Sequence, residues 1–335
     1  MLYFRLDMNE IIATGHAMRC LSIADAARGM GEEVTFILAD THAVELIETR
    51  GHRAIVLQTD WRDMESELDA IAKVIEAEKI KTILVDSYQV TPEYLKSLRK
   101  MVKVAYLDDL NAFPYDVDML ICYANYYKKF AYEERYRDIK LCLGMTYAPL
   151  RNVFSNCDRK QIAKKADKLL LLSGGADALD ILDRLLETIP KSDYERIDVI
   201  CGVYYPKYEL ICDKYKKYPN VCIHRAVSDI EKYMKDADMA VSAGGSTLYE
   251  LCAMGTPVIS YAFVDNQLDN VIRFAQDNVI EYAGDARTED VIANINRLLL
   301  KYREDKALRE EKSKRMQCLV DGKGAIRLVE ALKGL

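Results

Sequence analysis

The sequence predicts an α/β protein built from two doubly wound units with parallel sheets. Short apolar runs alternate with helical stretches along most of the 335 residues, which is typical of parallel sheets with right-handed crossovers. A tyrosine-rich, charged segment at residues 123–166 interrupts this alternation once. The chain is also longer than one hydrophobic core usually supports. We therefore expect two domains, residues 1–155 and 156–335.

In the first domain, β-rich runs separated by helical stretches give six expected strands: Met1–Leu6, Glu33–Leu38, Ala54–Leu57, Thr82–Val85, Val102–Leu107 and Met119–Cys122. Helices are expected between some of them, at His16–Met30, Ala43–Thr49 and Met64–Glu78. In an open sheet of this kind, ligands bind at the carboxyl ends of the strands.

A second series of strands is expected at Lys168–Leu172, Arg196–Cys201, Val221–His224, Met239–Val241, Val258–Tyr261 and Val279–Tyr282. The chain then turns helical, at Glu289–Tyr302, Lys306–Leu319 and Ala325–Leu332. The run of charged residues from Lys301 to Arg315 is read as a solvated helix face.

Composition narrows the class of function. A net charge of −6 argues against a general nucleic-acid binder. No apolar run approaches the roughly 20 residues that span a membrane, and the first residues do not look like a signal peptide. The nine cysteines form no CxxC pair and look like core residues of a reducing compartment. We expect a cytoplasmic enzyme; its oligomeric state is open, and a monomer is compatible with the sequence.

The stretch from Ala237 to Ile259 carries the clearest functional pattern. It reads as a buried strand, a turn at Gly244-Gly245, a short helix closed by Gly255 and a further strand. Glycines let a ligand approach the backbone, and a following helix aims free N–H groups at an anion such as a diphosphate. Glu250 lies one turn along the same helix face as Ser246, where it can accept hydrogen bonds from ribose hydroxyls. Alternatively, Thr247 and Glu250 form a capping box.

His16 is the candidate for acid–base chemistry. It follows Gly15 at the start of a helix and close to the end of the first strand. A helix N-terminus disfavours the imidazolium cation, and a neutral imidazole in a cleft can take a proton from water or a hydroxyl. The plain alternative is a partly exposed histidine with no role.

Several short motifs occur in a fixed order from residue 3 to about residue 285: Arg5-x-Asp7, Gly15-His16-x-x-Arg19-Cys20, Val85-Asp86-Ser87-Tyr88, Leu107-Asp108-Asp109, Gly144-x-x-Tyr147-Ala148-x-Leu150-Arg151, Ser173-Gly174-Gly175-Ala176-Asp177, the Ser242–Gly255 block, and Asn266-Gln267. The set resembles the UDP-sugar hydrolases of pseudaminic acid biosynthesis, the PseG family, which has spore coat polysaccharide relatives. The resemblance implies a GT-B fold, with the two domains facing each other across a cleft.

The resemblance also implies roles. His16 would activate water, which attacks the anomeric carbon of a UDP-linked diacetamido-trideoxy hexose with inversion, without a metal or other cofactor. The sugar would be bound by Asp7, Tyr88, Asp108, Asp109 and Asn266. UDP would be bound by Gly15, Gly174, Gly175, Gly244, Gly245, Ser246, Thr247 and Glu250. Plainer alternatives exist for several of these residues. The aspartates can be turn residues, Tyr88 can be a surface aromatic, and Asn266 can cap a helix. Gly174-Gly175 can form a tight turn, with Asp177 capping the next helix.

Two other patterns allow competing interpretations. Asp116-x-Asp118 has the spacing of a metal-binding motif but is read as turn chemistry before a strand. The tyrosines of residues 123–136 suggest base stacking, yet the acidic surroundings favour a packed interdomain loop.

The family's usual Gly-x-Gly-His is replaced here by Ala13-Thr14-Gly15-His16, and Cys122, Ala124 and Asp277-Asn278 also depart from its pattern. These departures concern the expected sugar side more than the UDP side. Two rival functions stay open. One is a glycosyltransferase, because the nucleotide block also resembles the enzyme that adds N-acetylglucosamine to the peptidoglycan lipid precursor. The other is a UDP-sugar-binding protein without catalysis.

Overall fold

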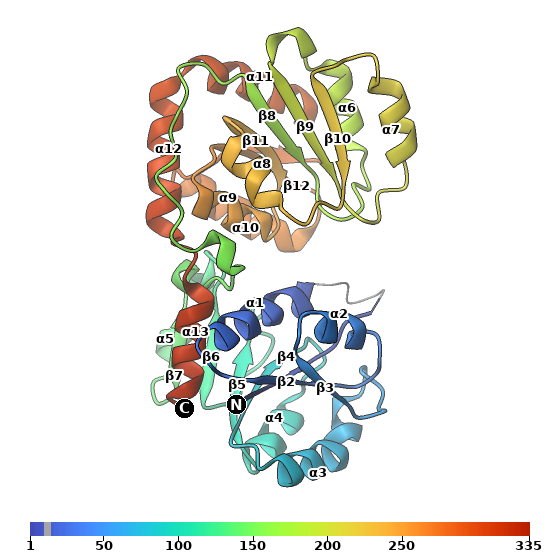
Figure 1. The fold of residues 1–335 in the computed structure, drawn as a ribbon. Coiled ribbons are helices and arrows are strands. Elements are labelled where there is room, and N and C mark those ends of the chain that lie inside the picture. The colour runs from blue at the N-terminus through green and yellow to red at the C-terminus, as the bar shows by residue number, and fades with distance from the viewer. Residues whose placement is uncertain (10–14) are drawn as a thin grey trace. The chain divides into compact units, whose positions relative to one another are not determined.

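The computed structural model describes residues 1–9 and 15–335. Two compact units divide the chain (Figure 1). Unit 1 contains Met1–Ser155 together with Gly322–Leu335, and unit 2 contains Asn156–Asp321. The predicted pair of parallel-sheet α/β units is confirmed.

Unit 1 is built on a seven-stranded sheet with the order β3-β2-β1-β4-β5-β6-β7. Every neighbouring pair is parallel. The strands are β1 (Leu2–Leu6), β2 (Val34–Leu38), β3 (Arg53–Val56), β4 (Thr82–Asp86), β5 (Lys103–Leu107), β6 (Met119–Cys122) and β7 (Lys140–Leu143). The order reverses at β1, which has β2 on one side and β4 on the other.

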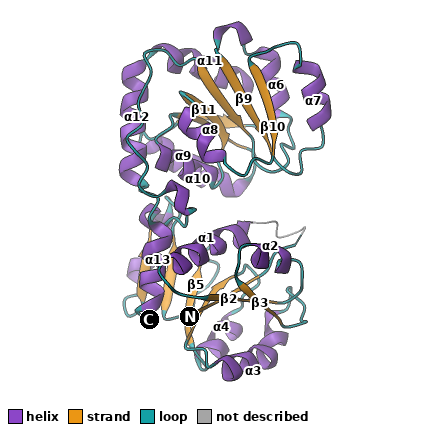
Figure 2. Ribbon diagram, viewed as in Figure 1, coloured by secondary structure: helices purple, strands orange, loops and turns teal. Residues whose placement is uncertain are grey.

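Helices cover both faces of this sheet (Figure 2). One face carries α1 (Gly15–Gly29), α2 (Val44–Thr49) and α13 (Gly324–Lys333); the other carries α3 (Leu68–Glu78) and α4 (Pro92–Arg99). The central strand β1 serves both cores, because successive side chains point to opposite faces. Leu2, Phe4 and Leu6 pack on the α1 side, and Tyr3 packs on the α3 side.

The position of α13 differs from the prediction, which placed residues 322–335 in the second domain. The helix packs on α1, with Leu328, Val329 and Leu332 in the core of unit 1. Its end is also tied to that unit, because Lys333 forms an ion pair with Glu32 at 2.8 Å. Sequence alone does not show which sheet an amphipathic terminal helix will cover.

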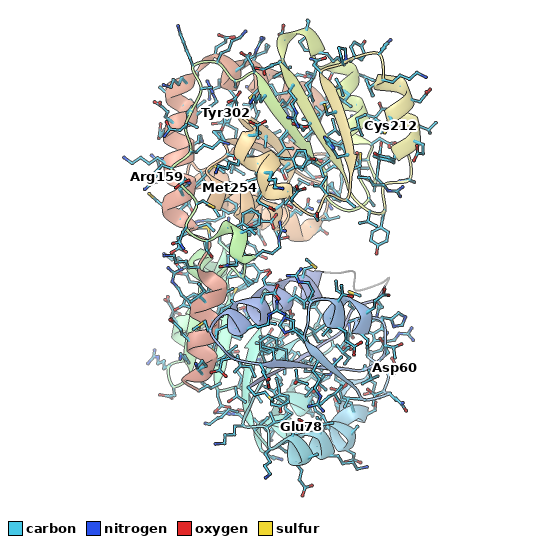
Figure 3. All side chains as sticks on the ribbon, in the orientation of Figure 1. Asp60, Glu78, Arg159, Cys212, Met254 and Tyr302 are labelled. Carbon is cyan, nitrogen blue, oxygen red and sulfur yellow. The ribbon has the colours of Figure 1, made fainter. Side chains whose placement is uncertain are left out.

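Unit 2 repeats the strand order of unit 1 in a six-stranded parallel sheet, β10-β9-β8-β11-β12-β13. Its strands are β8 (Lys168–Leu172), β9 (Arg196–Cys201), β10 (Val221–Arg225), β11 (Met239–Ala243), β12 (Val258–Ala262) and β13 (Glu281–Asp285). Its helices are α6 (Ile181–Thr188), α7 (Tyr208–Tyr215), α8 (Ile230–Asp236), α9 (Thr247–Met254), α10 (Asp265–Gln276), α11 (Val291–Glu304) and α12 (Lys306–Leu319). Tyr302 is fully buried in the core between α6, α11 and the sheet (Figure 3).

The charged run in α12 is only partly a solvated face. Arg309 and Lys312 are buried. The Arg309 guanidinium donates to the carbonyls of Ala163 and Lys164, and Lys312 Nζ donates to Ile280 O at 3.1 Å. These cations therefore fix α12 and the chain entering unit 2, because a buried charge needs hydrogen-bonding partners.

The segment from residue 123 to 144 packs into unit 1. It contains η2 (Tyr127–Phe130), α5 (Tyr132–Arg135) and the edge strand β7, which the sequence did not predict. Tyr132 and Tyr136 are buried beside Tyr115 in the α3-side core, so these tyrosines form part of a hydrophobic core.

Asp116 and Asp118 lie at the amino end of β6 and contact cations. Arg99 pairs with both, and Lys103 Nζ lies 2.9 Å from Asp118. Asp118 also accepts the Val104 amide at 3.0 Å. These contacts tie the pair to cations and to a strand amide, and they do not test the predicted turn role. Among the described residues, no helix is long and apolar enough to cross a membrane.

The packing of α13 gives a stability prediction. Leu328→Ala should lower the free energy of unfolding by about 2–5 kcal/mol, because it leaves a cavity at a fully buried position. The control Leu300→Ala removes a leucine that is 62% exposed and should change stability by less than about 0.5 kcal/mol. Urea unfolding measures both. Equal, small effects would mean that α13 is not part of the core of unit 1.

Candidate active site

The strand order of unit 1 fixes where a ligand site is expected. In a doubly wound sheet the crevice lies at the carboxyl ends of the strands where the order reverses, here between β1 and β4. Asp7 follows β1 directly, Asp86 is the last residue of β4, and His16 is the second residue of α1. Three side chains capable of acid–base chemistry therefore lie at the carboxyl ends of neighbouring strands.

His16 and Asp86 form a close pair. His16 Nδ1 lies 2.5 Å from Asp86 Oδ1, and both side chains are buried. Two lone pairs do not approach so closely, so we assign a proton on Nδ1 that is donated to the carboxylate. The neutral ring then has its lone pair on Nε2, which is the arrangement of a general base oriented by a carboxylate.

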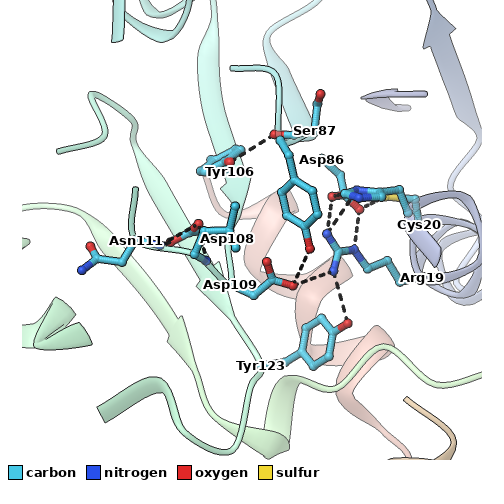
Figure 4. A network of polar contacts seen from close by, with 12 residues as sticks. Arg19, Cys20, Asp86, Ser87, Tyr106, Asp108, Asp109, Asn111 and Tyr123 are labelled. Atoms are coloured by element: carbon cyan, nitrogen blue, oxygen red, sulfur yellow. Dashed lines mark hydrogen bonds and ion pairs between the residues drawn. The ribbon is translucent and has the colours of Figure 1, made fainter. Parts of the chain in front are cut away.

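Arg19 holds the same carboxylate from a second direction (Figure 4). Its Nε lies 2.6 Å from Asp86 Oδ2 and its Nη2 lies 2.5 Å from Oδ1, a bidentate pair. Burial alone raises the pKa of Asp86, but the charge of Arg19 and the hydrogen bonds from Arg19 and His16 outweigh it and hold that pKa well below its usual range. Asp86 therefore stays ionised at neutral pH and keeps the proton on His16 Nδ1.

Tyr88 and Asp109 extend the network. Tyr88 Oη donates to Asp109 Oδ2 at 3.0 Å, and Arg19 Nη1 lies 3.3 Å from the same oxygen. The Tyr88 ring stands edge-on to the His16 ring, with 4.6 Å between centroids. Arg19 Nη1 also reaches the hydroxyl of Tyr123 at 3.4 Å. The Tyr88 ring thus packs against the His16 ring, and the Tyr88 hydroxyl is held by the Asp109 carboxylate.

A pocket of about 250 Å³ opens beside these groups. Its lining combines the base, two carboxylates, two aromatic rings and two further polar side chains: Asp7, His16, Trp61, Asp86, Ser87, Tyr88 and Gln89. Such a mixture of apolar surface and a few polar groups is typical of small-molecule sites.

The two aspartates after β5 have different positions. Asp108 is buried and accepts from the amides of Leu110 and Asn111 and from the hydroxyls of Tyr115 and Tyr132. Its acceptor capacity is used inside the protein, which argues against the sugar-binding role predicted for it. Asp109 faces the Tyr88–Arg19 network instead (Figure 4).

Unit 2 presents backbone groups at its own reversal point, between β8 and β11. Gly174 follows β8 with φ +86°, a left-handed conformation that favours glycine. The neighbouring helix α6 has its first amides occupied, because Asp177 accepts from Ile181 and Leu182 at 2.9 Å. These bonds fit the alternative interpretation, in which Asp177 caps the helix.

The other glycine loop leaves amides available. Ser246 is the N-cap of α9 without a side-chain cap, and Thr247 is the first residue inside the helix, so the capping-box alternative is not supported. Within the part of the chain that the structure describes, the amides of Gly245, Ser246 and Thr247 donate to no protein acceptor. Together with the helix N-terminus, three such amides suit an anion.

The remaining predicted residues are dispersed. A side chain at Gly244 would clash with Val271, and the Gly244 amide donates to Tyr261 O at 2.9 Å. Gly244 therefore has a structural role in the turn. Glu250 is half-buried in the first turn of α9, and Gly175 follows Gly174. Gly15 begins α1 in unit 1. The side chain of Asn266, in α10, lies outside the described part of the structure.

Sequence reasoning assigned no role to Asp86, Arg19, Trp61 or Gln89. Asp86 and Arg19 both belong to the ordered motifs described above. The sequence feature that could have indicated a role for Asp86 is its position at the end of a buried strand. That strand became significant only once β4 was seen beside β1.

Comparisons with known proteins agree with this architecture. Residues 154–315 match the family model described as Glycosyl transferases group 1. The chain has the fold of the GT-B glycosyltransferases: MurG of Acinetobacter baumannii superposes with a TM-score of 0.73 over 100% of both chains, at 12% identity.

Two curated relatives match part of the chain. Uncharacterized protein MJ1062 of Methanocaldococcus jannaschii is 23% identical over 76% of this chain and 54% of its own length. Spore coat polysaccharide biosynthesis protein SpsG of Bacillus subtilis is 27% identical over 57% of this chain and 58% of its own length. The chain thus spans little more than half the length of these relatives.

The pairing of Asp86 gives a pH prediction. A carboxyl group whose pKa is depressed by folding stabilises the protein above its unfolded pKa of about 3.9, and this contribution is lost as the pH falls toward the folded value. Wild-type stability should therefore fall more steeply than that of Asp86→Asn between pH 5 and pH 3 in urea unfolding. Asp213→Asn, which changes a carboxylate with a side chain 76% exposed, should keep the wild-type slope. Parallel curves for wild type and Asp86→Asn would contradict the assigned pairing.

Proposed function

We propose that this chain hydrolyses a UDP-linked N-acetylated deoxy sugar, releasing UDP and the free sugar in the synthesis of a nonulosonic acid or another surface polysaccharide. The observation that carries the proposal is the His16–Asp86 pair at 2.5 Å in the unit 1 pocket. The sugar class comes from the resemblance to the PseG family, and the match to SpsG supports a role in polysaccharide synthesis.

In the proposed step, His16 Nε2 removes a proton from water as the water oxygen bonds to the anomeric carbon. The bond from that carbon to the diphosphate oxygen breaks, and UDP leaves with the electron pair. Attack opposite the leaving group inverts the anomeric configuration. Asp86 stabilises the imidazolium that forms, as an ionised carboxylate does beside a histidine base.

Unit 2 would hold the leaving group. The amides of Gly245, Ser246 and Thr247 at the start of α9 can donate to the diphosphate, and Glu250 can accept from the ribose. Fixed dipoles of this kind stabilise the charge that develops on the leaving oxygen, so the proposed step uses no metal.

A glycosyltransferase is the second candidate, favoured by the match of residues 154–315 to a transferase family model. That match covers most of unit 2, which would bind the nucleotide in either reaction. It does not reach the His16 pocket, where the same base would deprotonate an acceptor hydroxyl instead of water. The two functions therefore differ in whether water or an acceptor hydroxyl enters the pocket of unit 1.

The catalytic role of His16 is tested by UDP release from a panel of UDP-N-acetylated sugars, with a chelator present and no acceptor. His16→Gln should lower kcat by about 10²–10⁴-fold, because it removes the base and keeps the size of the side chain. His42→Gln is a matched control, since His42 also pairs with an aspartate, Asp40 at 2.7 Å, but is 60% exposed. It should keep wild-type activity.

The outcomes separate the candidate functions. Release of UDP with an inverted sugar supports hydrolysis. Release that requires an added acceptor supports the transferase. Tight UDP binding with no release in either case would leave a binding protein.

The UDP site gives a separate prediction. A Cβ at Gly245 meets no atom within 4 Å, so Gly245→Ala should fold, and it is the control for the added size of a side chain. Gly245→Asp adds a negative charge at the proposed diphosphate position and should weaken UDP binding by at least about tenfold. Calorimetric titration with UDP measures both. Equal affinities for the two variants would place the diphosphate elsewhere.

A further inference from the structure

Trp61, the single tryptophan of the chain, lines the pocket that holds His16. We propose that its indole ring is the apolar platform on which the substrate sugar packs, and that the pocket accepts an uncharged pyranose and rejects an anionic one. This inference rests on the proposed function, because it takes the His16 pocket to be the sugar site. It adds a residue and a selectivity that the catalytic argument does not require.

The loop after β3 holds Trp61 in a defined place. The amides of Leu57 and Thr59 donate to Leu38 O and Ala39 O, which extends the pairing of β3 with β2. Asp60, labelled at the surface of unit 1 in Figure 3, closes the turn by accepting the Arg62 amide at 3.0 Å. A half-buried aromatic ring fixed in this way loses little conformational entropy when a ligand packs on it.

One face of the indole ring is covered by protein. The Arg62 guanidinium lies 5.3 Å from the ring centre, in the range of a cation–π contact. The proposal places the ligand on the opposite face of the ring, because Trp61 lines the pocket. A pyranose presents a patch of C–H groups on one face, and such apolar surface is the natural partner of an aromatic ring.

The polar wall of the pocket is fixed to the same loop. Asp7 forms an ion pair with the fully buried Arg5 at 2.7 Å. Arg5 Nε in turn donates at 2.8 Å to Glu67, which follows the Trp61 turn in η1 (Met64–Glu67). Platform and carboxylate are therefore linked through Arg5 and η1. A ring lying on Trp61 can direct a hydroxyl or amide hydrogen to Asp7.

The charges around the pocket explain the selectivity. Among the described residues that line it there are two aspartates and no lysine or arginine. Of the three nearby arginines, Arg62 is exposed to solvent beside Trp61. The other two are each shared by two carboxylates: Arg5 by Asp7 and Glu67, and Arg19 by Asp86 and Asp109. Each group of three carries one excess negative formal charge. A sugar carboxylate would be repelled, while a hydroxyl or acetamido group would find acceptors.

The single tryptophan makes the proposal directly measurable. Emission of the full-length protein would be titrated with UDP, with UDP-N-acetylglucosamine and with UDP-N-acetylglucosaminuronic acid, while equilibrium dialysis reports binding independently. We expect a saturable change in emission with UDP-N-acetylglucosamine, no change with bound UDP, and about tenfold weaker binding of the uronic acid derivative. If UDP-N-acetylglucosamine binds without changing the emission, Trp61 is not the platform. If the uronic acid derivative binds equally well, the pocket does not select by charge.

Variants test the platform in turnover. Trp61→Ala should raise KM for the sugar nucleotide by about tenfold with little change in kcat, because packing stabilises ground and transition states alike. Trp61→Phe keeps a ring and should restore most of the affinity. Met101→Ala shortens an exposed side chain just before β5, at the amino ends of the strands and away from the pocket. It should behave as wild type. Unchanged kinetics in Trp61→Ala would overturn the proposal.

This inference and the proposed function fail in distinguishable ways. If UDP is released and substitutions of Trp61 change nothing, hydrolysis remains supported and the role of Trp61 as a platform is excluded. An emission change with UDP-N-acetylglucosamine, without release of UDP from any sugar nucleotide, would keep the sugar subsite and remove hydrolysis. Failure to bind either UDP or the sugar nucleotide would remove both.

Discussion

The buried carboxylate of Asp86 is the interaction on which the candidate site depends. It ends β4, and both of its strong partners, His16 and Arg19, come from α1, so it fixes the start of that helix against the sheet. A buried carboxylate costs several kcal/mol unless it is paired. Here the pairing that removes this cost also sets the tautomer of the histidine, so stability and the proposed chemistry have the same origin.

The two units share one topology but present different chemical groups at the same place in it. Both sheets reverse their strand order between the first and fourth strands, and the candidate groups of each lie there. In unit 1 these groups are side chains that form a pocket with acidic walls. In unit 2 they are backbone amides at the start of α9. A UDP-sugar joins an uncharged sugar ring to an anionic diphosphate and a nucleoside, and the proposed function assigns the sugar to unit 1 and the diphosphate to unit 2.

Sequence reasoning succeeded where the cause is local. Short apolar runs predicted the strands other than β7, and Gly255, which adopts φ +69°, marked the end of α9. It failed where the cause is tertiary. Asp86 gains its role because β4 lies beside β1, and Trp61 reaches the pocket on a loop far from His16 in sequence. The burial of Arg309 and Lys312 was missed because the carbonyl groups that receive them are distant in the chain.

The central claim is that water attacks the anomeric carbon, and isotope labelling tests it most directly. The reaction would be run in water enriched in oxygen-18, and the released UDP would be analysed by mass spectrometry. Attack at carbon breaks the carbon–oxygen bond, so the account predicts UDP without the heavy isotope. UDP carrying one oxygen-18 would show attack at phosphorus and would contradict the role proposed for His16.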